Sequence, residues 1–179
     1  MKKWLIVYSS NTGNTKQVAE AMYEALGSEN ALIQDVKENP DLTDFDVLVC
    51  GFWVTRGGPD LNSREFLTKV EDKQVVLFQT LGADPAGEHA VTSLAKAAYL
   101  VGDGCNILGT FSCRGKINPR LLEKRKTLPP DNPHSYSEEN EKRWAAAATH
   151  PNDEDLNFAR SFIKNMQRKL VLLENYEKY

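Results

Sequence analysis

The amino-acid sequence predicts an α/β fold, a three-layer doubly wound sandwich in which helices cover both faces of a five-stranded parallel sheet. Two observations predict this class. Short apolar runs alternate along the chain with segments whose apolar residues recur every three or four positions, and this succession of strand and helix builds a parallel sheet with right-handed crossovers. Several apolar runs also lack the alternation of a half-exposed strand, as strands covered on both faces do.

The N-terminal part contains the first strand, loop and helix of this succession. Residues 4–8 form an apolar run that predicts a strand, and apolar residues then recur at helical spacing as far as Leu26. Between them, the small polar residues and the glycine of segment 9–15 predict a tight loop. Residues 31–36 form a short second strand.

The rest of the succession has three more strands and three more helices. The strands are predicted at residues 44–53, 75–78 and 106–113, and the two helices between them at residues 63–70 and 88–100. A final helix is predicted at about 152–175. It carries an apolar stripe that packs on the sheet, formed by Leu156, Ala159, Ile163, Met166, Leu170 and Leu173.

One long connection interrupts this order. Residues 115–151 hold five prolines and a basic cluster, and the segment around 143–148 predicts one short helix. A connection of this length within one domain is typical of a lid, a binding loop or an ordered insertion, and a simple cover over the sheet edge is the alternative. We expect residues 1–179 to form a single domain that includes this insertion.

Composition and charge exclude several classes of function. The net charge of −3 does not suggest a nucleic-acid partner, and no apolar run approaches the length of a membrane span. The apolar run near the N-terminus is too short for a secretion signal, so a cytoplasmic protein is expected, as a monomer or weak dimer. Cys50, Cys105 and Cys113 lack the spacing of a disulfide framework or zinc site and are expected as small buried residues.

The loop at residues 9–15 has the chemistry of a phosphate site. It lies between a strand and the start of a helix, where backbone N–H groups and the helix dipole favour an anion, and it adds hydroxyl groups. It lacks the GxGxxG pattern of dinucleotide sites and the GK[ST] ending of triphosphate loops, so a single phosphate monoester suits it best. The alternative is an ordinary strand-to-helix connection with turn and N-cap residues.

The order of residues in this loop favours the phosphate. Residues 10–15, Ser-Asn-Thr-Gly-Asn-Thr, match the S/T-x-T-G-N-T phosphate loop of flavodoxins in the first strand-to-helix turn. The chain therefore resembles the flavodoxin and flavodoxin-like family, which binds flavin mononucleotide (FMN). The resemblance implies the strand order 2-1-3-4-5, with the phosphate in the first loop and the isoalloxazine ring between the loops that follow the third and fourth strands.

The resemblance also implies which residues bind the cofactor. Those of the first loop are Ser9, Ser10, Asn11, Thr12, Gly13, Asn14 and Thr15. Those after the third strand are Trp53, Val54, Thr55, Arg56 and Gly57, with Gly58 supplying conformational freedom. Those after the fourth strand are Thr80, Leu81, Gly82, Ala83 and Asp84. Strand alternation sends either Phe52 or Trp53 into the core, and Trp53 is favoured as the aromatic wall of the site.

Two features differ from typical flavodoxins. The loop after the fourth strand has no stacking tyrosine, so the outer face of the ring is expected to be open, or covered by His89 or by the insertion. The chain is also only slightly acidic and carries Arg56 beside the expected ring. We hypothesise that Arg56 stabilises the negative charge of the reduced flavin and makes its potential less negative.

Three functions are compatible with the sequence. The first is an electron carrier that passes electrons to a redox protein, with no catalytic side chain, because the flavin supplies the chemistry. The second is an FMN-dependent reductase of quinones or other small acceptors that uses a nicotinamide cofactor. Its pocket would be built by the insertion, with Arg114, His134, Tyr136 and Trp144. The third is a regulatory or binding domain that has lost the flavin.

Overall fold

A computed structural model describes residues 2–176 of the chain. Its parallel strands are β1 (Trp4–Tyr8), β2 (Ala31–Asp35), β3 (Val47–Thr55), β5 (Gln74–Leu81) and β6 (Asn106–Arg114). They lie in the order β2-β1-β3-β5-β6, which confirms the predicted order of five parallel strands. A two-residue strand, β4 (Gly58–Pro59), pairs antiparallel with the end of β3, and the sequence did not indicate it.

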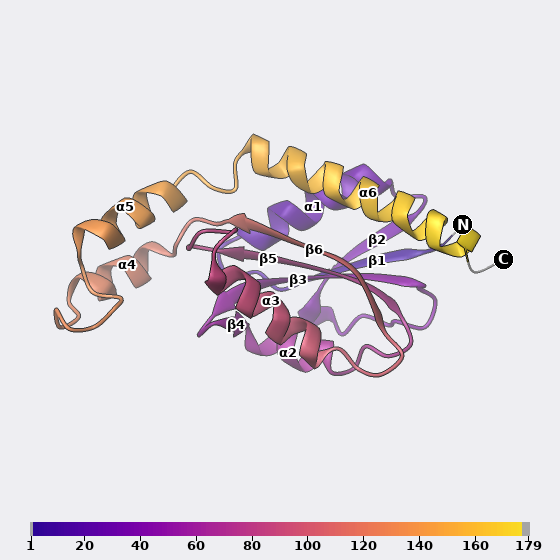
Figure 1. Cartoon of the computed structure of the whole chain (residues 1–179), viewed down its shortest axis with the longest axis horizontal. Helices are drawn as coiled ribbons and strands as arrows, with labels where there is room; N and C mark the ends of the chain where they lie inside the picture. The colour runs from indigo at the N-terminus through magenta and orange to yellow at the C-terminus, as the bar shows by residue number, and fades with distance from the viewer. Residues whose placement is uncertain (1, 177–179) are drawn as a thin grey trace.

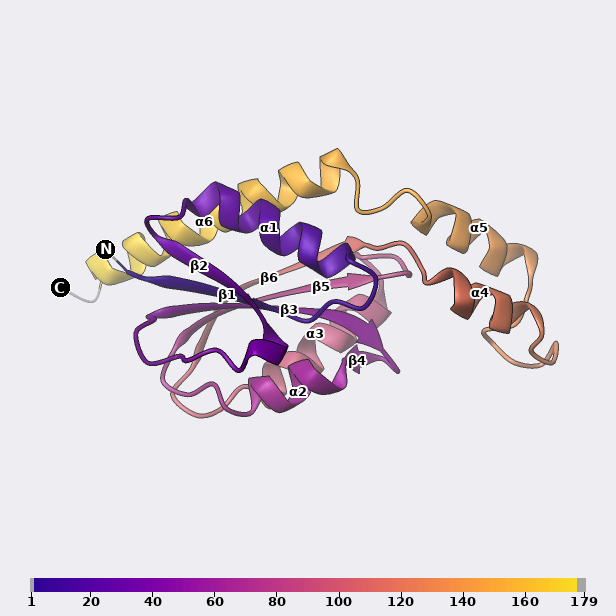
Figure 2. The ribbon, with the colours of Figure 1, turned by 180° about the vertical axis from the view of Figure 1, so that it is seen from behind.

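Helices cover both faces of the sheet, so the predicted three-layer sandwich is confirmed (Figure 1). Helices α1 (Asn14–Leu26) and α6 (Asp153–Tyr176) cover one face, and α2 (Leu61–Leu67) and α3 (Glu88–Leu100) cover the other (Figures 1 and 2). Each face has its own apolar core. Met22 and Ile163 are buried in the first core, and Leu67 and Ala97 in the second.

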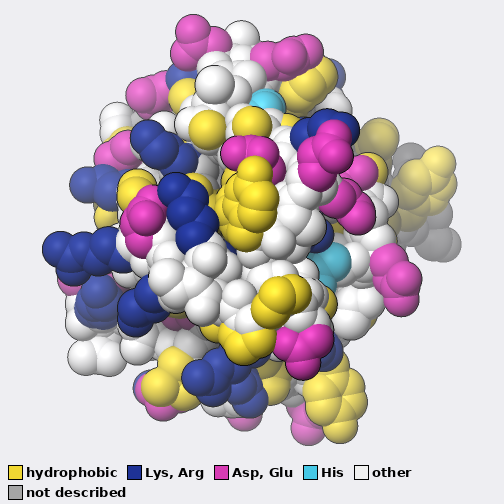
Figure 3. Space-filling view, turned by 90° about the vertical axis from the view of Figure 1, so that its left-hand side faces the viewer, with side chains coloured by type: hydrophobic (Ala, Val, Ile, Leu, Met, Phe, Trp, Pro, Cys, Tyr) yellow, Lys and Arg dark blue, Asp and Glu magenta, His cyan; other side chains and the backbone are white. Residues whose placement is uncertain are grey.

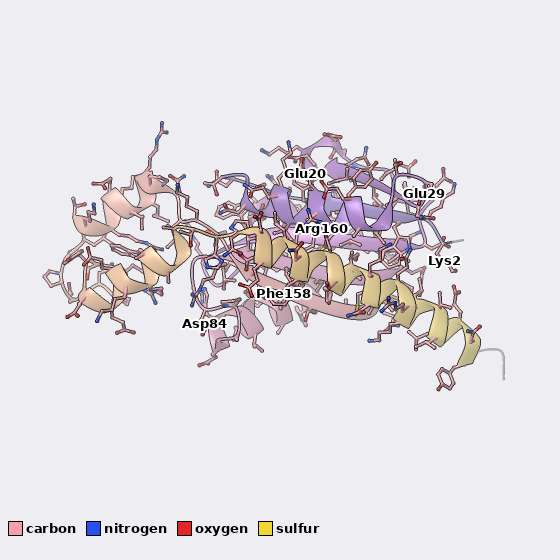
Figure 4. The ribbon with its side chains drawn as sticks, turned by 90° about the horizontal axis from the view of Figure 1, so that it is seen from above. Lys2, Glu20, Glu29, Asp84, Phe158 and Arg160 are labelled. Carbon is pink, nitrogen blue, oxygen red and sulfur yellow. The ribbon has the colours of Figure 1, made fainter. Side chains whose placement is uncertain are left out.

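Helix α6 follows the whole length of the sheet on its face. Ala159, Ile163 and Leu170 of the predicted apolar stripe are buried against strands and α1. On the side toward α1, Arg160 Nη2 donates a hydrogen bond to Glu24 Oε2 at 2.9 Å (Figure 4). The stripe therefore has the core-packing role that its spacing predicts.

Several element ends differ from the prediction for local reasons. Strand β3 begins at Val47 and continues to Thr55, because its end pairs with β4. The second strand stops at Asp35, whose carboxylate accepts a hydrogen bond from Lys37 N and caps a short 3-10 helix, η1 (Val36–Glu38). Helix α2 begins earlier than expected, since Asp60 caps it.

The connection between β3 and β4 is a two-residue hairpin turn. Its central residues, Arg56 and Gly57, have φ angles of 51° and 73°, as a type I′ turn requires. The flanking pair is Thr55 with Gly58, and Gly58 has no positive φ angle. The glycine whose conformational freedom the turn requires is therefore Gly57, and not Gly58 as predicted. Arg56 adopts a conformation that non-glycine residues seldom take.

The insertion contains two helices where one was predicted. Helix α4 (Pro119–Lys126) begins with Pro119 behind the N-cap Asn118, and α5 (Glu138–Ala147) begins behind the N-cap Ser137. Figures 1 and 4 show the two helices as neighbours beyond the carboxyl ends of the parallel strands. At the base of the insertion, Lys116 N donates to His150 O at 2.7 Å, so its two ends lie side by side.

The start of β1 and the end of α6 lie at the opposite end of the sheet from α4 and α5 (Figure 1). Among the helices in residues 2–176, none combines the length and apolar character that a bilayer crossing requires.

Candidate functional site

A cleft of about 660 Å³ lies at the carboxyl ends of the strands. Four parts of the chain line it: the loop after β1, the β3–β4 hairpin, the end of β5 with its loop, and the insertion. Its size is within the range of pockets that hold small molecules or cofactors. The edge of the sheet is where doubly wound folds bind ligands, so this cleft is the candidate site.

The start of α1 in this cleft has free backbone donors. Gly13, the N-cap, has a φ angle of 89° and provides no side-chain cap, and the first turn has no acidic residue. Every other helix that the structure describes has a side-chain cap or an acidic residue in its first turn. Within the described chain, the N–H groups of Asn14, Thr15 and Lys16 have no hydrogen-bond acceptor. This helix end is therefore suited to an anion.

The predicted residues of the first loop divide into two groups. Asn11, Thr12 and Asn14 line the cleft. The hydroxyls of the others are engaged inside the protein: Ser9 Oγ donates to Asp60 Oδ1 at 2.8 Å, and Thr15 Oγ1 lies 2.9 Å from Thr80 Oγ1. Ser10 Oγ accepts from Gly13 N at 3.1 Å. These three hydroxyls hold the shape of the loop.

Asn14 joins the loop to the insertion. Its Nδ2 donates to Lys116 O at 2.9 Å and to Thr12 Oγ1 at 3.1 Å. Gly115, which also lines the cleft, passes so close that an added Cβ would lie 2.8 Å from Asn14 Nδ2. The loop and the base of the insertion are therefore one packed unit, and glycine permits the close approach.

The β3–β4 hairpin forms a second wall. Trp53, Val54, Thr55, Arg56 and Gly57 all line the cleft. Phe52 is only 1% exposed and lies in the core on the side of α2 and α3, as alternation along the strand requires. The structure thus places Trp53, and not Phe52, at the cleft.

The end of β5 and its loop form the third wall. Thr80, Leu81, Gly82 and Ala83 line the cleft, together with His89 at the start of α3. Asp84 does not, and its Oδ1 accepts a hydrogen bond from Ala86 N at 3.0 Å within the loop.

The insertion forms the fourth wall, most of which the sequence did not predict. Of the four residues proposed for a pocket there, His134 lines the cleft, whereas Arg114, Tyr136 and Trp144 do not. Tyr136 Oη instead donates to Glu141 Oε2 at 2.9 Å. The side chains missed by the sequence reasoning are Lys116, Ile117, Asn118, Leu121, Arg125 and Arg143. The one available signal was the spacing of Leu121 and Arg125, which places both on one face of α4.

The charge of the cleft is strongly one-sided. The cationic side chains Arg56, Lys116, Arg125 and Arg143 line it, and no aspartate or glutamate of residues 2–176 does. Burial, with a further contribution from Arg143, lowers the pKa of Arg125 below its ordinary value. The cleft is therefore locally positive, although the whole chain has a net charge of −3.

Comparisons with known proteins agree with this architecture. A model of the flavodoxin domain matches residues 5–164. The flavodoxin-like domain-containing protein BilS of Clostridioides difficile (strain CD3) is 34% identical over 178 residues, which cover 96% of this chain and 99% of that protein. The protein of the same name from Clostridium symbiosum (strain WAL-14163) is 28% identical, with 90% and 94% covered.

A solved structure of a flavodoxin from the domain Archaea shares the fold. It matches with a TM-score of 0.57 at 16% sequence identity, over 93% of this chain and 97% of that chain. The resemblance between the two structures therefore includes the sheet and the helices on both of its faces.

Proposed function

The chain belongs to the flavodoxin domain family, and from this premise we propose that it binds FMN noncovalently in the cleft and passes electrons between redox partners. One observation carries the proposal: the uncapped start of α1 offers free backbone donors beside a cleft of cofactor size. FMN, when bound, supplies the redox chemistry, since its ring accepts and releases electrons.

The residues of the chain bind and orient this cofactor. The N–H groups at the start of α1, with Asn11, Thr12 and Asn14, are suited to hold a phosphate monoester. Trp53 offers a flat apolar surface for ring stacking. The backbone of segment 80–83 offers donors and acceptors for the polar edge of the ring. No side chain is assigned an acid, base or nucleophile role in this proposal.

The first experiment measures FMN binding to the purified apoprotein by quenching of flavin fluorescence. Riboflavin is the comparison ligand, because it has the ring without the phosphate. We expect FMN to bind far more tightly than riboflavin, and equal affinities would contradict the proposed phosphate site.

A charge variant sharpens this test. Asn11 is exposed at the cleft, so Asn11→Asp adds a negative charge beside the proposed phosphate with little change of shape. We expect FMN affinity to fall by about tenfold and riboflavin affinity to stay unchanged, because only the phosphate is repelled. Asn165→Asp on α6, away from the cleft, is the matched control. An equal loss for both ligands would show a structural effect of the substitution.

A second candidate function is an FMN-dependent reductase of quinones or other small acceptors that oxidises NADH or NADPH. The specific observation in its favour is the fourth wall, since α4 and α5 give the cleft a basic side on which a small molecule can bind. Steady-state oxidation of NADH or NADPH by the FMN-loaded protein with a quinone distinguishes the two. A carrier shows negligible turnover without a protein partner.

A further inference from the structure

Three side chains of the insertion meet at one side of the cleft. Arg125 comes from α4, Arg143 from α5 and His134 from the connection between them, and Leu121 lies on the same wall one helical turn before Arg125. The wall thus combines cationic groups with an apolar side chain. These residues belong to a part of the chain remote in sequence from the loop at the start of α1.

The positive charge of the cleft exceeds the need of one phosphate. A phosphate monoester carries about −1.5 to −2 charges at neutral pH, and the start of α1 can bind it with uncharged donors. Arg56, Lys116, Arg125 and Arg143 add four formal positive charges, with no carboxylate on the lining of the described chain. A second anion in the cleft would balance this excess.

The two arginines lack the ion pairs that one lysine of each helix forms. On α4, Lys126 pairs with Glu123, and on α5, Lys142 pairs with Glu138. Arg125 and Arg143 form no ion pair within residues 2–176, and Arg143 Nη2 donates only to the neutral Oδ1 of Asn140. Both are half-buried, where two neighbouring like charges are unfavourable unless an anion joins them.

Charge is also unevenly spread over this end of the molecule. Figure 3 looks at the end that carries α4 and α5, and there Lys and Arg side chains gather on the left and lower part, with Asp and Glu side chains above and to the right. The last turn of α4 carries Lys124, Arg125 and Lys126, and the first turn of α5 carries Glu138, Glu139 and Glu141. Helix α4 is therefore the more basic of the two helices at this end of the molecule.

We propose that Arg125 and Arg143 form a second anion subsite, which binds the carboxylate or phosphate group of a small electron donor or acceptor of the flavin. The inference rests on the proposed function, since it assigns a small-molecule partner to the same cleft. A guanidinium group presents paired donors that match either oxyanion, and two of them bind one such group from two sides. Leu121 would contact the apolar body of the molecule.

The test uses FMN-loaded protein, in which FMN occupies the loop at the start of α1. Pyrophosphate and citrate serve as probes for the phosphate and carboxylate classes, with binding measured by calorimetry and by the change in flavin absorbance. We expect at least one probe to bind. Arg125→Gln and Arg143→Gln should each weaken it by about tenfold, the typical effect of removing a charged hydrogen bond.

Arg120→Gln is the matched control, because it removes the same charge from an exposed position of α4 outside the cleft. It should leave probe affinity unchanged, and no variant should change FMN affinity more than about twofold. Arg143→Lys keeps the charge without the paired donors and should show an intermediate loss. Arg125→Gln breaks no hydrogen bond in the described chain, so its effect is free of any disturbance of α5.

Several results would overturn the subsite: binding of neither probe, an equal loss in Arg120→Gln, or a loss of FMN affinity in place of probe affinity. Failure of the wild type to bind FMN would instead refute the proposed function. In that case the probes are tested on the apoprotein. Probe binding that Arg125→Gln and Arg143→Gln weaken would still support the subsite, and probe binding that neither variant changes would refute it. The probe that binds identifies the class of partner.

Discussion

At the scale of single residues, the buried carboxylate of Asp60 joins three parts of the fold. Its Oδ1 accepts from Ser9 Oγ at 2.8 Å, and its Oδ2 accepts from Ser63 Oγ at 2.8 Å. It is also the N-cap of α2 and ends the β3–β4 hairpin. One side chain thus links the loop after β1 to the hairpin and to a helix on the far face of the sheet.

Replacing this carboxylate should therefore weaken the fold. For Asp60→Ala we expect the free energy of unfolding to fall by about 1–3 kcal/mol, because a buried network loses its acceptor and a helix loses its cap. Urea denaturation measures this. Asp41→Ala is the matched control, since Asp41 is an exposed acceptor for Thr43 and should matter less. A larger effect at Asp41 would contradict the role assigned to Asp60.

Arg56 is predicted to tune the flavin potential. It lines the cleft, and a positive charge near the ring favours the reduced flavin, so removing that charge should make the potential more negative by tens of millivolts. Asn is the better replacement, because it tolerates the φ angle of 51° that Ala would adopt with strain. Redox titration should show the shift in Arg56→Asn but not in Arg56→Lys. An unchanged or less negative potential in Arg56→Asn would refute the hypothesis.

A buried thiol should make stability depend on alkaline pH. Burial, with a smaller contribution from Asp155, raises the pKa of Cys113 from 9.0 to about 12. Between these values the unfolded thiol has lost a proton that the folded thiol keeps, so the unfolding free energy should fall by about 1.4 kcal/mol per pH unit. Denaturation of Cys113→Ala should show a shallower fall than the wild type above pH 9, and the same slope in both would contradict this assignment.

At the scale of elements, the insertion is a separate part attached at one point. Its ends meet at the hydrogen bond between Lys116 N and His150 O, and α4 and α5 lie beyond the sheet (Figure 2). The two apolar cores are built from the sheet, α1, α2, α3 and α6, without a residue of the insertion. The fold and the fourth wall of the cleft therefore depend on different segments.

This separation predicts the effect of removing the insertion. Replacing residues 118–149 with a short Gly-Ser linker should leave a cooperatively folded protein, because neither core loses a side chain. FMN should still bind through the start of α1, whereas binding of pyrophosphate and citrate should be lost. Denaturation and titration measure both properties, and loss of cooperative unfolding would show that the insertion is part of the core.

At the scale of the whole molecule, exposed apolar side chains are dispersed. Leu61 on α2 and Tyr99 on α3 lie on one side of the sheet, and Phe158 on α6 lies on the other. Scattered apolar residues are normal on a monomer, whereas a stable interface needs a contiguous apolar patch. We therefore expect a 20.1 kDa monomer, or a weak dimer, in sedimentation velocity at micromolar concentration. A stable dimer across that range would contradict this expectation.

The fold and the position of the site can be predicted from the sequence alone. The strand order was implied by the resemblance to flavodoxins, and the structure confirms it. Both helical layers and the loop at the start of α1 follow from local patterns: uninterrupted apolar runs, helical spacing and a characteristic turn. Alternation along β3 also predicts that Phe52 and Trp53 lie on opposite faces of the strand, as the structure shows. These features depend on neighbours in sequence, so the chain displays them directly.

The remaining walls and contacts of the cleft depend on segments that lie far apart in the sequence. The hydroxyls of Ser9 and Thr15 have partners 51 and 65 residues away, and no local pattern reveals that they are engaged. Arg125 and Arg143 meet at the cleft because two separately capped helices fold back over the strand ends. Periodicity identifies the face of a helix that is apolar, but not the partner that it meets, because that depends on packing between segments remote in the chain.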